Sequence, residues 1–269
     1  MLSAMRGDLT HYGRVRLWGS VGFIVAVTAG GELLDWRGIE LVPWLAWVML
    51  GMVLLASLRL RELVPTHIGH VMPSVLAILQ RREVLAFFTS SFLMIAAHAS
   101  LYVFFSLYLA QLGYSKTIIG VMWSLGVVAE IAFFYYQAPL FRRYGVRTLL
   151  LVSLALAALR FLIIGAGAQS LAWLLLAQVL HAATFGTHHS ACVMAMQRWF
   201  AGPLQASGQA LYISISYGLG GTAGGLLMSM CWDRFGARSV FIVAALFALL
   251  ALIAAVLSLR WQDRQARSI

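Results

Sequence analysis

Eight apolar segments separated by short polar connections dominate the chain. They lie at 14–34, 41–59, 84–110, 117–138, 148–167, 171–196, 208–230 and 239–259. Each is long enough for an α-helix to cross about 30 Å of hydrocarbon. Turn-forming residues support the breaks between them. Pro43 begins the second segment, Gly113 follows the third, Pro139 follows the fourth, and Pro203 lies between the sixth and seventh. The pattern predicts an all-helical integral membrane bundle with eight transmembrane helices.

The composition agrees with a membrane location. Hydrophobic residues make up 62% of the chain and charged residues 10%, with a mean hydropathy of +0.88. Soluble domains carry about a quarter charged residues, so a soluble fold is excluded. The net charge of +10 is typical of nucleic-acid-binding proteins, but here the arginines lie in short connections between apolar segments. We therefore expect the lipid bilayer, and no nucleic acid, as a partner.

The positive charges are divided unequally between the two sides that the eight segments define. Fourteen of the nineteen Lys and Arg residues fall on the side that holds both termini, and four fall on the other side. The remaining cation, Arg160, lies inside a segment. Cytoplasmic loops carry the excess of positive charge in membrane proteins. This predicts a multi-pass protein of the bacterial inner membrane with both termini in the cytoplasm.

A short string occurs twice, which indicates a repeated helix pair. TAGG begins at Thr28 and again at Thr222, 194 residues later, each time near the end of an apolar, glycine-rich segment. Repeated halves of this length are typical of transporters built from two six-helix halves. The longest polar connection, 60–83, has two segments before it and six after it.

The repeat therefore predicts three regions. We expect 1–59 to form the last two helices of an N-terminal half, 60–83 a cytoplasmic central linker, and 84–269 a C-terminal six-helix half. The sequence would then lack the first four of twelve helices, as a fragment or a chain begun at a late start codon does.

Two opposite charges lie deep in the apolar segments. Glu130 is the only carboxylate in the middle of a segment, and Arg160 is the only cation. Charges inside a bilayer need partners or a wet cavity, so the two form either a structural ion pair or a functional site. In the functional interpretation Glu130 exchanges a proton, and the guanidinium of Arg160 holds a solute carboxylate.

Four histidines in the apolar segments are candidates for proton transfer or solute binding. His181 and His188 are seven residues apart, which predicts a shared helix face, with His189 turned about 100° from His188. His98 is equally consistent with a solute contact and with a structural hydrogen bond. A metal site is the weaker interpretation because no acidic ligand lies beside these histidines. We therefore expect no metal and no cofactor.

The tryptophans are assigned to structure and not to chemistry. Most tryptophans, including Trp123, fall near segment ends, which indicates an interfacial belt. An intramembrane enzyme using His181, His188 or Ser190 is an alternative class of function. No serine–histidine or metal arrangement of known spacing is present, so we expect no enzymatic activity.

Three strings carry a resemblance to a known family. They are HYGRVRLWGSVGFIV at 11–25, WSLGVVAEI at 123–131 and PLFRRYGVR at 139–147. These strings resemble the phenylpropionate transporter group of the major facilitator superfamily, and the resemblance covers nearly the whole chain. That group is similar to lactose permease and to nucleoside–proton symporters. The resemblance implies the major facilitator fold, with the solute bound midway between two halves that rock against each other.

The similarity to lactose permease also implies residue roles. Within GRVR, Arg16 matches an arginine that contacts the solute. Arg160 and His181, 21 residues apart, match an arginine and a histidine of neighbouring helices, and Glu130 approximately matches a glutamate. Thr184 stands where the family has its proton-carrying carboxylate. Because threonine cannot ionise, the resemblance places the proton on other groups. The Asp and Lys pairs of lactose permease are absent, which argues against sugar specificity.

We therefore expect secondary active transport of a small organic solute, an aromatic or other carboxylate, with proton symport. The expected solute-binding residues are Arg16, His98, Arg160 and His181. The expected proton-coupling residues are Glu130 and His181, with His188 and His189 as further candidates. A sugar or nucleoside proton symporter and a non-transporting membrane remnant are the alternatives.

Overall fold

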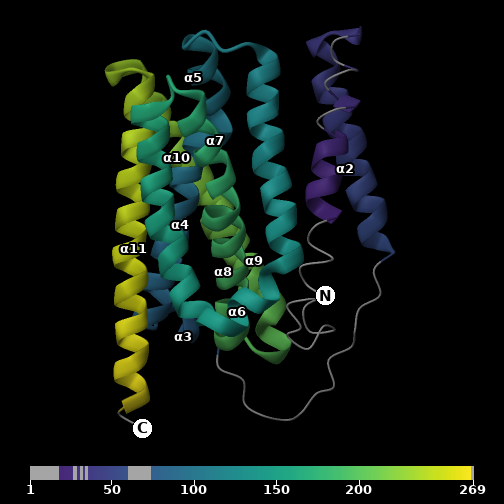
Figure 1. The fold of residues 1–269 in the computed structure, drawn as a ribbon. Coiled ribbons are helices and arrows are strands. Elements are labelled where there is room, and N and C mark those ends of the chain that lie inside the picture. The colour runs from purple at the N-terminus through teal and green to yellow at the C-terminus, as the bar shows by residue number, and fades with distance from the viewer. Residues whose placement is uncertain (1–17, 27–28, 31–32, 34–35, 60–73, 268–269) are drawn as a thin grey trace.

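All secondary-structure elements in the described part of the chain are helices, which confirms the all-helical prediction (Figure 1). The structure is a computed structural model that describes residues 18–26, 29–30, 33, 36–59 and 74–267. Helical segments within 18–37 precede η2 (Ile39–Leu41) and α2 (Val42–Leu58). Pro43 lies in the first turn of α2, where its missing N–H costs nothing.

The remaining elements form a bundle of long, nearly continuous helical runs. After α3 (Val75–Leu79) the first run joins α4 (Arg82–Ala99), η3 (Ser100–Phe104) and α5 (Phe105–Gln111). A second run joins α7 (Leu171–His181), η4 (Ala182–Gly186) and α8 (Thr187–Trp199). After η5 (Gly202–Leu204), a third joins α9 (Gln205–Tyr212), η6 (Ile213–Gly220) and α10 (Gly221–Phe235). In each of these three runs the middle element is a π-helix.

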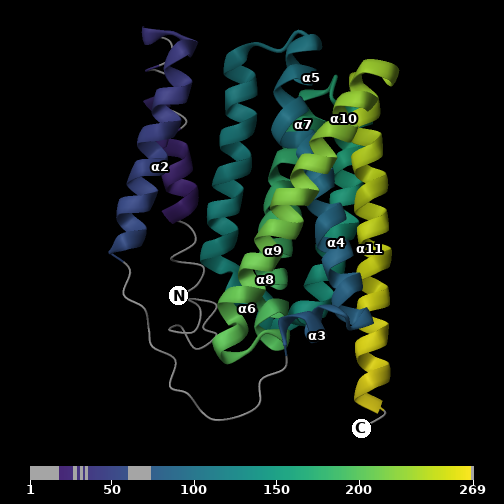
Figure 2. The same ribbon diagram turned by 180° about the vertical axis from the view of Figure 1, so that it is seen from behind.

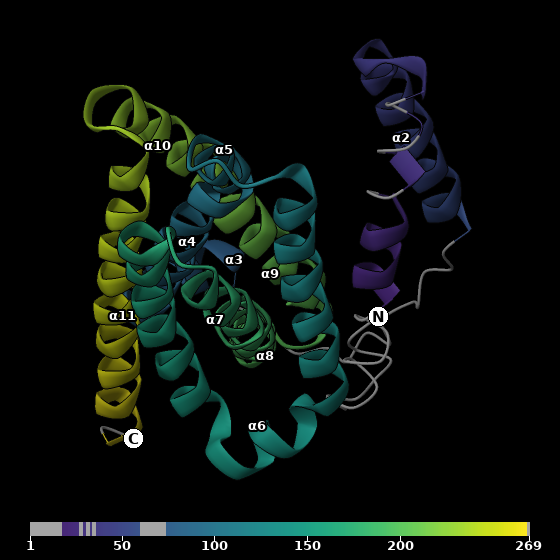
Figure 3. The ribbon, with the colours of Figure 1, turned by 45° about the horizontal axis from the view of Figure 1, so that its top comes forward.

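The helix α6 (Lys116–Gly167) is 52 residues long but consists of two antiparallel arms. The chain turns at Gly145, whose φ of 74° is readily adopted only by glycine. Figure 3 shows the two arms meeting at this bend. The first arm was expected to end before Pro139, but Pro139 lies inside the helix. A proline removes one hydrogen bond from a helix, and here the positive φ at Gly145, and not the proline, reverses the chain.

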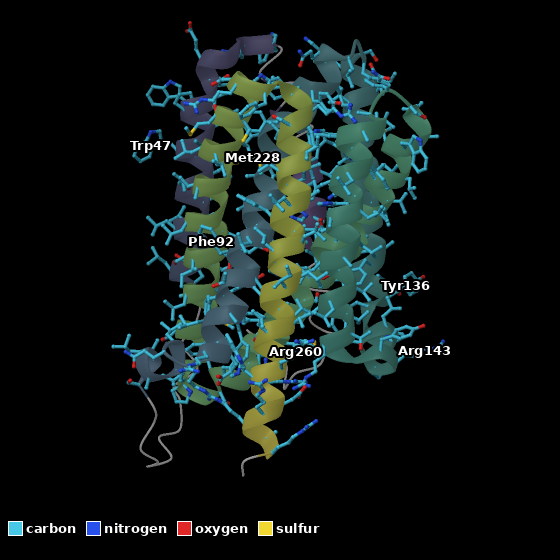
Figure 4. The ribbon with its side chains drawn as sticks, turned by 90° about the vertical axis from the view of Figure 1, so that its left-hand side faces the viewer. Trp47, Phe92, Tyr136, Arg143, Met228 and Arg260 are labelled. Carbon is cyan, nitrogen blue, oxygen red and sulfur yellow. The ribbon has the colours of Figure 1, made fainter. Side chains whose placement is uncertain are left out.

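The last helix, α11 (Ala237–Arg267), continues eight residues beyond the predicted end at 259. Its polar extension is bound to the start of α4, because Gln265 Nε2 donates to Glu83 Oε2 at 3.0 Å. Arg147, just after the bend in α6, donates to Asp263 at 2.5 Å. These bonds explain why a polar segment remains helical. Arg260 and Arg143 lie at the same end of the molecule (Figure 4).

Three helical stretches of the described residues are long and apolar enough to cross a membrane. They are Arg82–Gln111, Lys116–Gly167 and Ala237–Arg267, and α2 is apolar but shorter. The number of eight crossings stays a prediction. The helical segments of 18–37 and α2 stand together beside the first arm of α6 (Figures 1 and 2), and α2 buries none of its residues.

Close contact between α10 and α4 depends on missing side chains. A Cβ atom added to Gly224 would lie 2.5 Å from the carbonyl oxygen of Ala96, and one added to Gly220 would lie 2.8 Å from that of Phe92. Both distances are too short for real atoms, so glycine sets how closely the two helices approach.

Candidate functional site

A partly open cavity of about 270 Å³ lies between the helical residues 18–26 and the bundle. Its walls come from residues 18–26, from η3, from the first arm of α6 and from the run α7–η4. The lining residues are Gly19, Ser20, Phe23, Tyr102, Trp123, Gly126, Val127, Glu130, Gln178, His181 and Phe185. The cavity thus combines an aromatic wall with one carboxylate, one imidazole and one amide.

The carboxylate of Glu130 is buried at the wall of this cavity and is held from two sides. Glu130 Oε2 lies 3.5 Å from His181 Nε2, and the Ser20 hydroxyl donates to Glu130 Oε1 at 3.2 Å. The ion-pair interpretation placed Arg160 beside Glu130, but among the described residues the titratable group in contact with Glu130 is His181. A carboxylate and an imidazole in contact can share one proton, so the pair has the chemistry of a proton-binding site.

The π-helix η4 determines which histidine shares a face with His181. A π-helix closes i→i+5 hydrogen bonds and therefore takes more residues per turn than an α-helix. The Phe185 ring stacks on His181 at 5.3 Å and 6°, and on His189 at 6.3 Å and 14°, whereas His188 contacts Cys192 away from the cavity. The prediction that His181 and His188 share a face is wrong, because it assumed α-helical periodicity through 182–186.

His188 points into a separate polar cluster away from the cavity. Its Nε2 lies 3.4 Å from Cys192 Sγ, which lies 3.5 Å from Ser91 Oγ. His189 instead contacts the hydroxyl of Tyr217 through Nδ1 at 2.9 Å. Neither histidine lines the cavity.

Arg160 is fully buried behind the cavity and contacts neutral groups. Its Nε donates to the carbonyl oxygen of Ala177 at 2.6 Å, and its terminal nitrogens donate to Thr184 Oγ1 at 3.4 Å and Gln178 Oε1 at 3.5 Å. Within the described ranges no carboxylate lies in ion-pair distance of this guanidinium. The positive charge therefore acts on the cavity through Gln178, which it holds by the amide oxygen.

His98 packs against His181 and Phe185, two residues of the cavity wall. Its Nδ1 bonds to the carbonyl oxygen of Met94 at 2.9 Å, and since a carbonyl only accepts, Nδ1 carries the hydrogen. The imidazole lies 6.2 Å from that of His181 and 5.3 Å from the Phe161 ring, measured between centroids. His98 is thus close to the Glu130–His181 pair without lining the cavity. Arg16, the remaining predicted solute contact, lies outside the described residues.

Among the cavity-lining residues that were not predicted are three aromatic side chains of the bundle and one amide. Trp123 was assigned to the interfacial belt, but it lies two turns inside α6, donates to Ser106 at 2.9 Å and lines the cavity. Tyr102 and Phe185 carry no sequence signal that separates them from other core aromatics. Gln178 carries one, because it is an amide in an apolar segment one helical turn before His181.

Chemically, the site can bind a small molecule with an apolar, planar part and one polar end, and it can hold a proton. In the described part of the chain no group of three or more His, Cys, Asp or Glu side chains is arranged to hold a metal ion.

Comparison with known proteins identifies the relatives of this chain. The model of the MFS_1 like family matches residues 1–243. The chain is 32% identical over 249 residues to the "Probable 3-phenylpropionic acid transporter" of Escherichia coli (strain K12), which covers 90% of this chain and 64% of that protein. It is 26% identical to the "Uncharacterized transporter YwbF" of Bacillus subtilis (strain 168), over 90% of this chain and 60% of that protein.

A third relative, the "Maltose permease" of Geobacillus stearothermophilus, is 25% identical over 90% of this chain and 62% of its own length. The chain therefore spans about three fifths of the length of the curated relatives it matches. All three relatives are named as transporters or permeases and none as an enzyme. The family match and the long apolar helices make this chain a multi-pass membrane protein. The chain belongs to the MFS_1 like family, a transporter family of the major facilitator superfamily, and is related to its phenylpropionate group.

Proposed function

We propose that this protein carries a small aromatic carboxylate across the bacterial inner membrane together with a proton. The observation that supports this most is the cavity, in which an aromatic wall lies beside the buried Glu130–His181 pair. The relative named for 3-phenylpropionic acid supports the same class of solute.

The aromatic part of the solute would bind among the rings of the cavity. Tyr102 and Trp123 stack at 6.2 Å and 17°, and Phe185 meets Tyr102 edge-on at 6.3 Å and 80°. Aromatic rings pair favourably with one another in stacked and edge-to-face arrangements. A phenyl group therefore gains contacts here that an aliphatic chain of equal size does not.

The polar end of the solute would face the buried nitrogen groups of α4, α6 and α7. His98, Arg160 and His181 place cationic or cation-forming groups on one side of the cavity. Glu130 and His181 would carry the proton, since Thr184, which bonds to Arg160, cannot. Intramembrane ionisable residues commonly mark such solute and proton pathways.

A sugar symporter is the second candidate, because one relative is named as a maltose permease and aromatic side chains also cover the apolar faces of sugars. The two candidates differ in the polar groups they need. A sugar needs several hydrogen-bonding partners spread around the ring, whereas a phenyl carboxylate needs them at one end. The cavity places its charged and amide groups on the side formed by α6 and α7, which favours the carboxylate.

Binding of 3-phenylpropionate and of maltose to the whole chain in lipid nanodiscs distinguishes these candidates. We expect saturable quenching of tryptophan fluorescence by 3-phenylpropionate and none by maltose. Trp123→Phe should remove most of this quenching, whereas Trp173→Phe, at a half-exposed position outside the cavity, should not. Binding of maltose alone would replace the proposal by the sugar candidate, and binding of neither would contradict both.

We also propose that both termini lie in the cytoplasm, with 84–269 as the C-terminal six-helix half and 60–83 as its linker to 1–59. The support is the positive charge at the end of the molecule that holds α3, the bend of α6 and the C-terminus (Figure 1). Single cysteines at Arg143 and Arg234, probed with an impermeant maleimide in intact cells, test the orientation. Labelling of the cysteine at 143 but not of that at 234 would contradict it.

A further inference from the structure

Of the described residues that line the cavity, two have a buried side-chain nitrogen atom without a hydrogen-bond partner. The two atoms are Gln178 Nε2 and His181 Nδ1. Their residues lie three positions apart on α7, so their side chains emerge from the same face. Both residues line the cavity. An unpaired buried polar atom costs free energy, so a pair of them at a cavity wall points to a ligand that satisfies both.

The orientation of the Gln178 amide follows from Arg160. A guanidinium has only donors, so the atom of Gln178 that faces Arg160 at 3.5 Å must be the amide oxygen. The NH2 group is therefore turned away from Arg160 and is left as a donor without a partner. Gly126 gives this amide its space, because a Cβ at that position would lie 3.0 Å from Gln178 Oε1.

The second nitrogen depends on the proton content of the Glu130–His181 pair. When Glu130 is a carboxylate and His181 is neutral, Nε2 carries the hydrogen that faces Glu130, and Nδ1 is an acceptor. One added proton changes this in either of two ways. It binds Nδ1 directly, or it binds Glu130, which then donates to Nε2 while the imidazole hydrogen moves to Nδ1. In both cases Nδ1 becomes a donor.

Resting on the proposed function, we infer that Gln178 Nε2 and His181 Nδ1 form the carboxylate site of the solute, complete only after the Glu130–His181 pair gains one proton. The lone pair of an unprotonated Nδ1 repels an anion, whereas a protonated Nδ1 donates a hydrogen bond to it. The added proton balances the added carboxylate charge, so net charge in the cavity does not change. Arg160 is then a positioning residue, which holds Gln178 and does not touch the solute.

Charged and titratable groups from three elements of the described chain surround His181. Glu130 and Arg160 face it from α6, His98 from α4 and Tyr102 from η3. The two site nitrogens are covered in this conformation. Phe185, whose ring lies flat on His181, is the side chain that must move for the carboxylate to enter.

Isothermal titration calorimetry of 3-phenylpropionate binding to the whole chain in nanodiscs tests the inference. Measured in two buffers of different ionisation enthalpy, binding to the unaltered protein should take up one proton per solute at pH 7.5. The affinity should also fall about tenfold per pH unit at high pH, as linkage of one proton requires. Binding with no proton uptake overturns the inference and leaves the proposed function standing, whereas no binding at all contradicts the proposed function.

Substitutions then test which side chain binds the carboxylate of the solute. Gln178→Leu should weaken binding tenfold or more without changing the number of protons taken up. Losing a hydrogen bond to a charged group weakens binding about tenfold to a hundredfold. Gln137→Leu, a buried glutamine of α6 outside the cavity, is the matched control and should bind as the unaltered chain does. Equal affinities of the two variants would overturn the role of Gln178.

The proton is assigned in the same way. His181→Gln should abolish proton uptake, whereas His188→Gln and His98→Gln should retain it. Proton uptake that survives in His181→Gln, or that is lost in His98→Gln, overturns the assignment to the Glu130–His181 pair. The neutral analogue 3-phenylpropanamide should bind without proton uptake. Its uptake of one proton would show that the coupling does not depend on the carboxylate.

Discussion

Glu130 and His181 contact each other across two helices, with 3.5 Å between Oε2 and Nε2. Glu130 lies on the first arm of α6, and His181 ends α7 just before the π-helical turn η4. Both residues line the cavity, so under the proposed function a change in the proton content of the pair acts directly on the bound solute.

Replacing Glu130 by glutamine should change the pH dependence of solute binding more than the fold. The amide can still contact His181 and Ser20, but it no longer supplies the negative charge that favours an imidazolium. We expect 3-phenylpropionate to bind Glu130→Gln at pH 5 about as well as it binds the unaltered chain, and at least tenfold more weakly at pH 7.5. Calorimetric titrations at the two pH values measure this. Equal loss at both values would mean that Glu130 contacts the solute and does not act through the proton.

Replacing Arg160 by lysine should weaken binding and lower stability together. An ammonium group cannot reach Ala177, Thr184 and Gln178 at once, so Gln178 is released from its fixed orientation. We expect about tenfold weaker solute binding and a loss of about 1–3 kcal/mol of stability from the buried acceptors left without a donor. Thermal unfolding with and without 3-phenylpropionate separates the two effects. A variant that is destabilised but binds normally would remove Arg160 from the site.

Adding a methyl group at Gly126 should disturb the cavity without disturbing the helix. In Gly126→Ala the new Cβ would lie 3.0 Å from Gln178 Oε1 and 3.6 Å from His181 Cδ2. We expect at least fivefold weaker binding of 3-phenylpropionate, because the amide must shift by a few tenths of an ångström. For scale, a tenfold change in affinity corresponds to about 1.4 kcal/mol. Gly120→Ala, on the same helix with nothing within 4 Å of its new Cβ, should bind normally. Equal binding by both variants would contradict the proposed placement of the solute.

Enlarging Gly224 should separate α10 from α4. A Cβ there would meet the carbonyl oxygen of Ala96 at 2.5 Å, and backbone cannot move aside as a flexible side chain does. We expect Gly224→Val to lose about 1–3 kcal/mol, the range for overpacking, seen as a lower Tm. Gly225→Val, at the neighbouring position with open space around it, should change the Tm little. If both variants unfold at the same temperature, the two helices do not approach as closely as described.

The apolar segments of the chain predicted the helical fold, because long runs of residues that avoid water are typical of membrane helices. They located Glu130, Arg160 and His181 for the same reason, since charges and histidines in apolar segments are easily seen. They did not predict the partners of these residues. Arg160 bonds to Gln178 and not to Glu130, and this depends on the relative rotation of α6 and α7, which no local pattern contains.

Aromatic residues show a second limit of the sequence. Trp123, near the start of α6, has the residue type and the position expected of an interfacial residue. Only the packing of the neighbouring helices places it at the cavity. The end of α11 was placed too early, at 259, because the polar string QDRQAR lies beyond the apolar segment, yet this string remains helical. It does so through tertiary bonds such as that between Gln265 and Glu83. Both errors arise where long-range contacts, and not local composition, decide the structure.

The π-helical turn η4 has a consequence for the comparison of relatives. Its extra residue per turn acts as an insertion that leaves the helix unbroken, and it brings His189 instead of His188 beneath Phe185. A homologue whose helix is regular here would carry one residue fewer, and its equivalent of His189 would be found by superposition and not by counting from His181. An alignment without a gap in 182–186 would match histidines that point in different directions, so residue roles transferred past this point need a one-residue offset to be tested first.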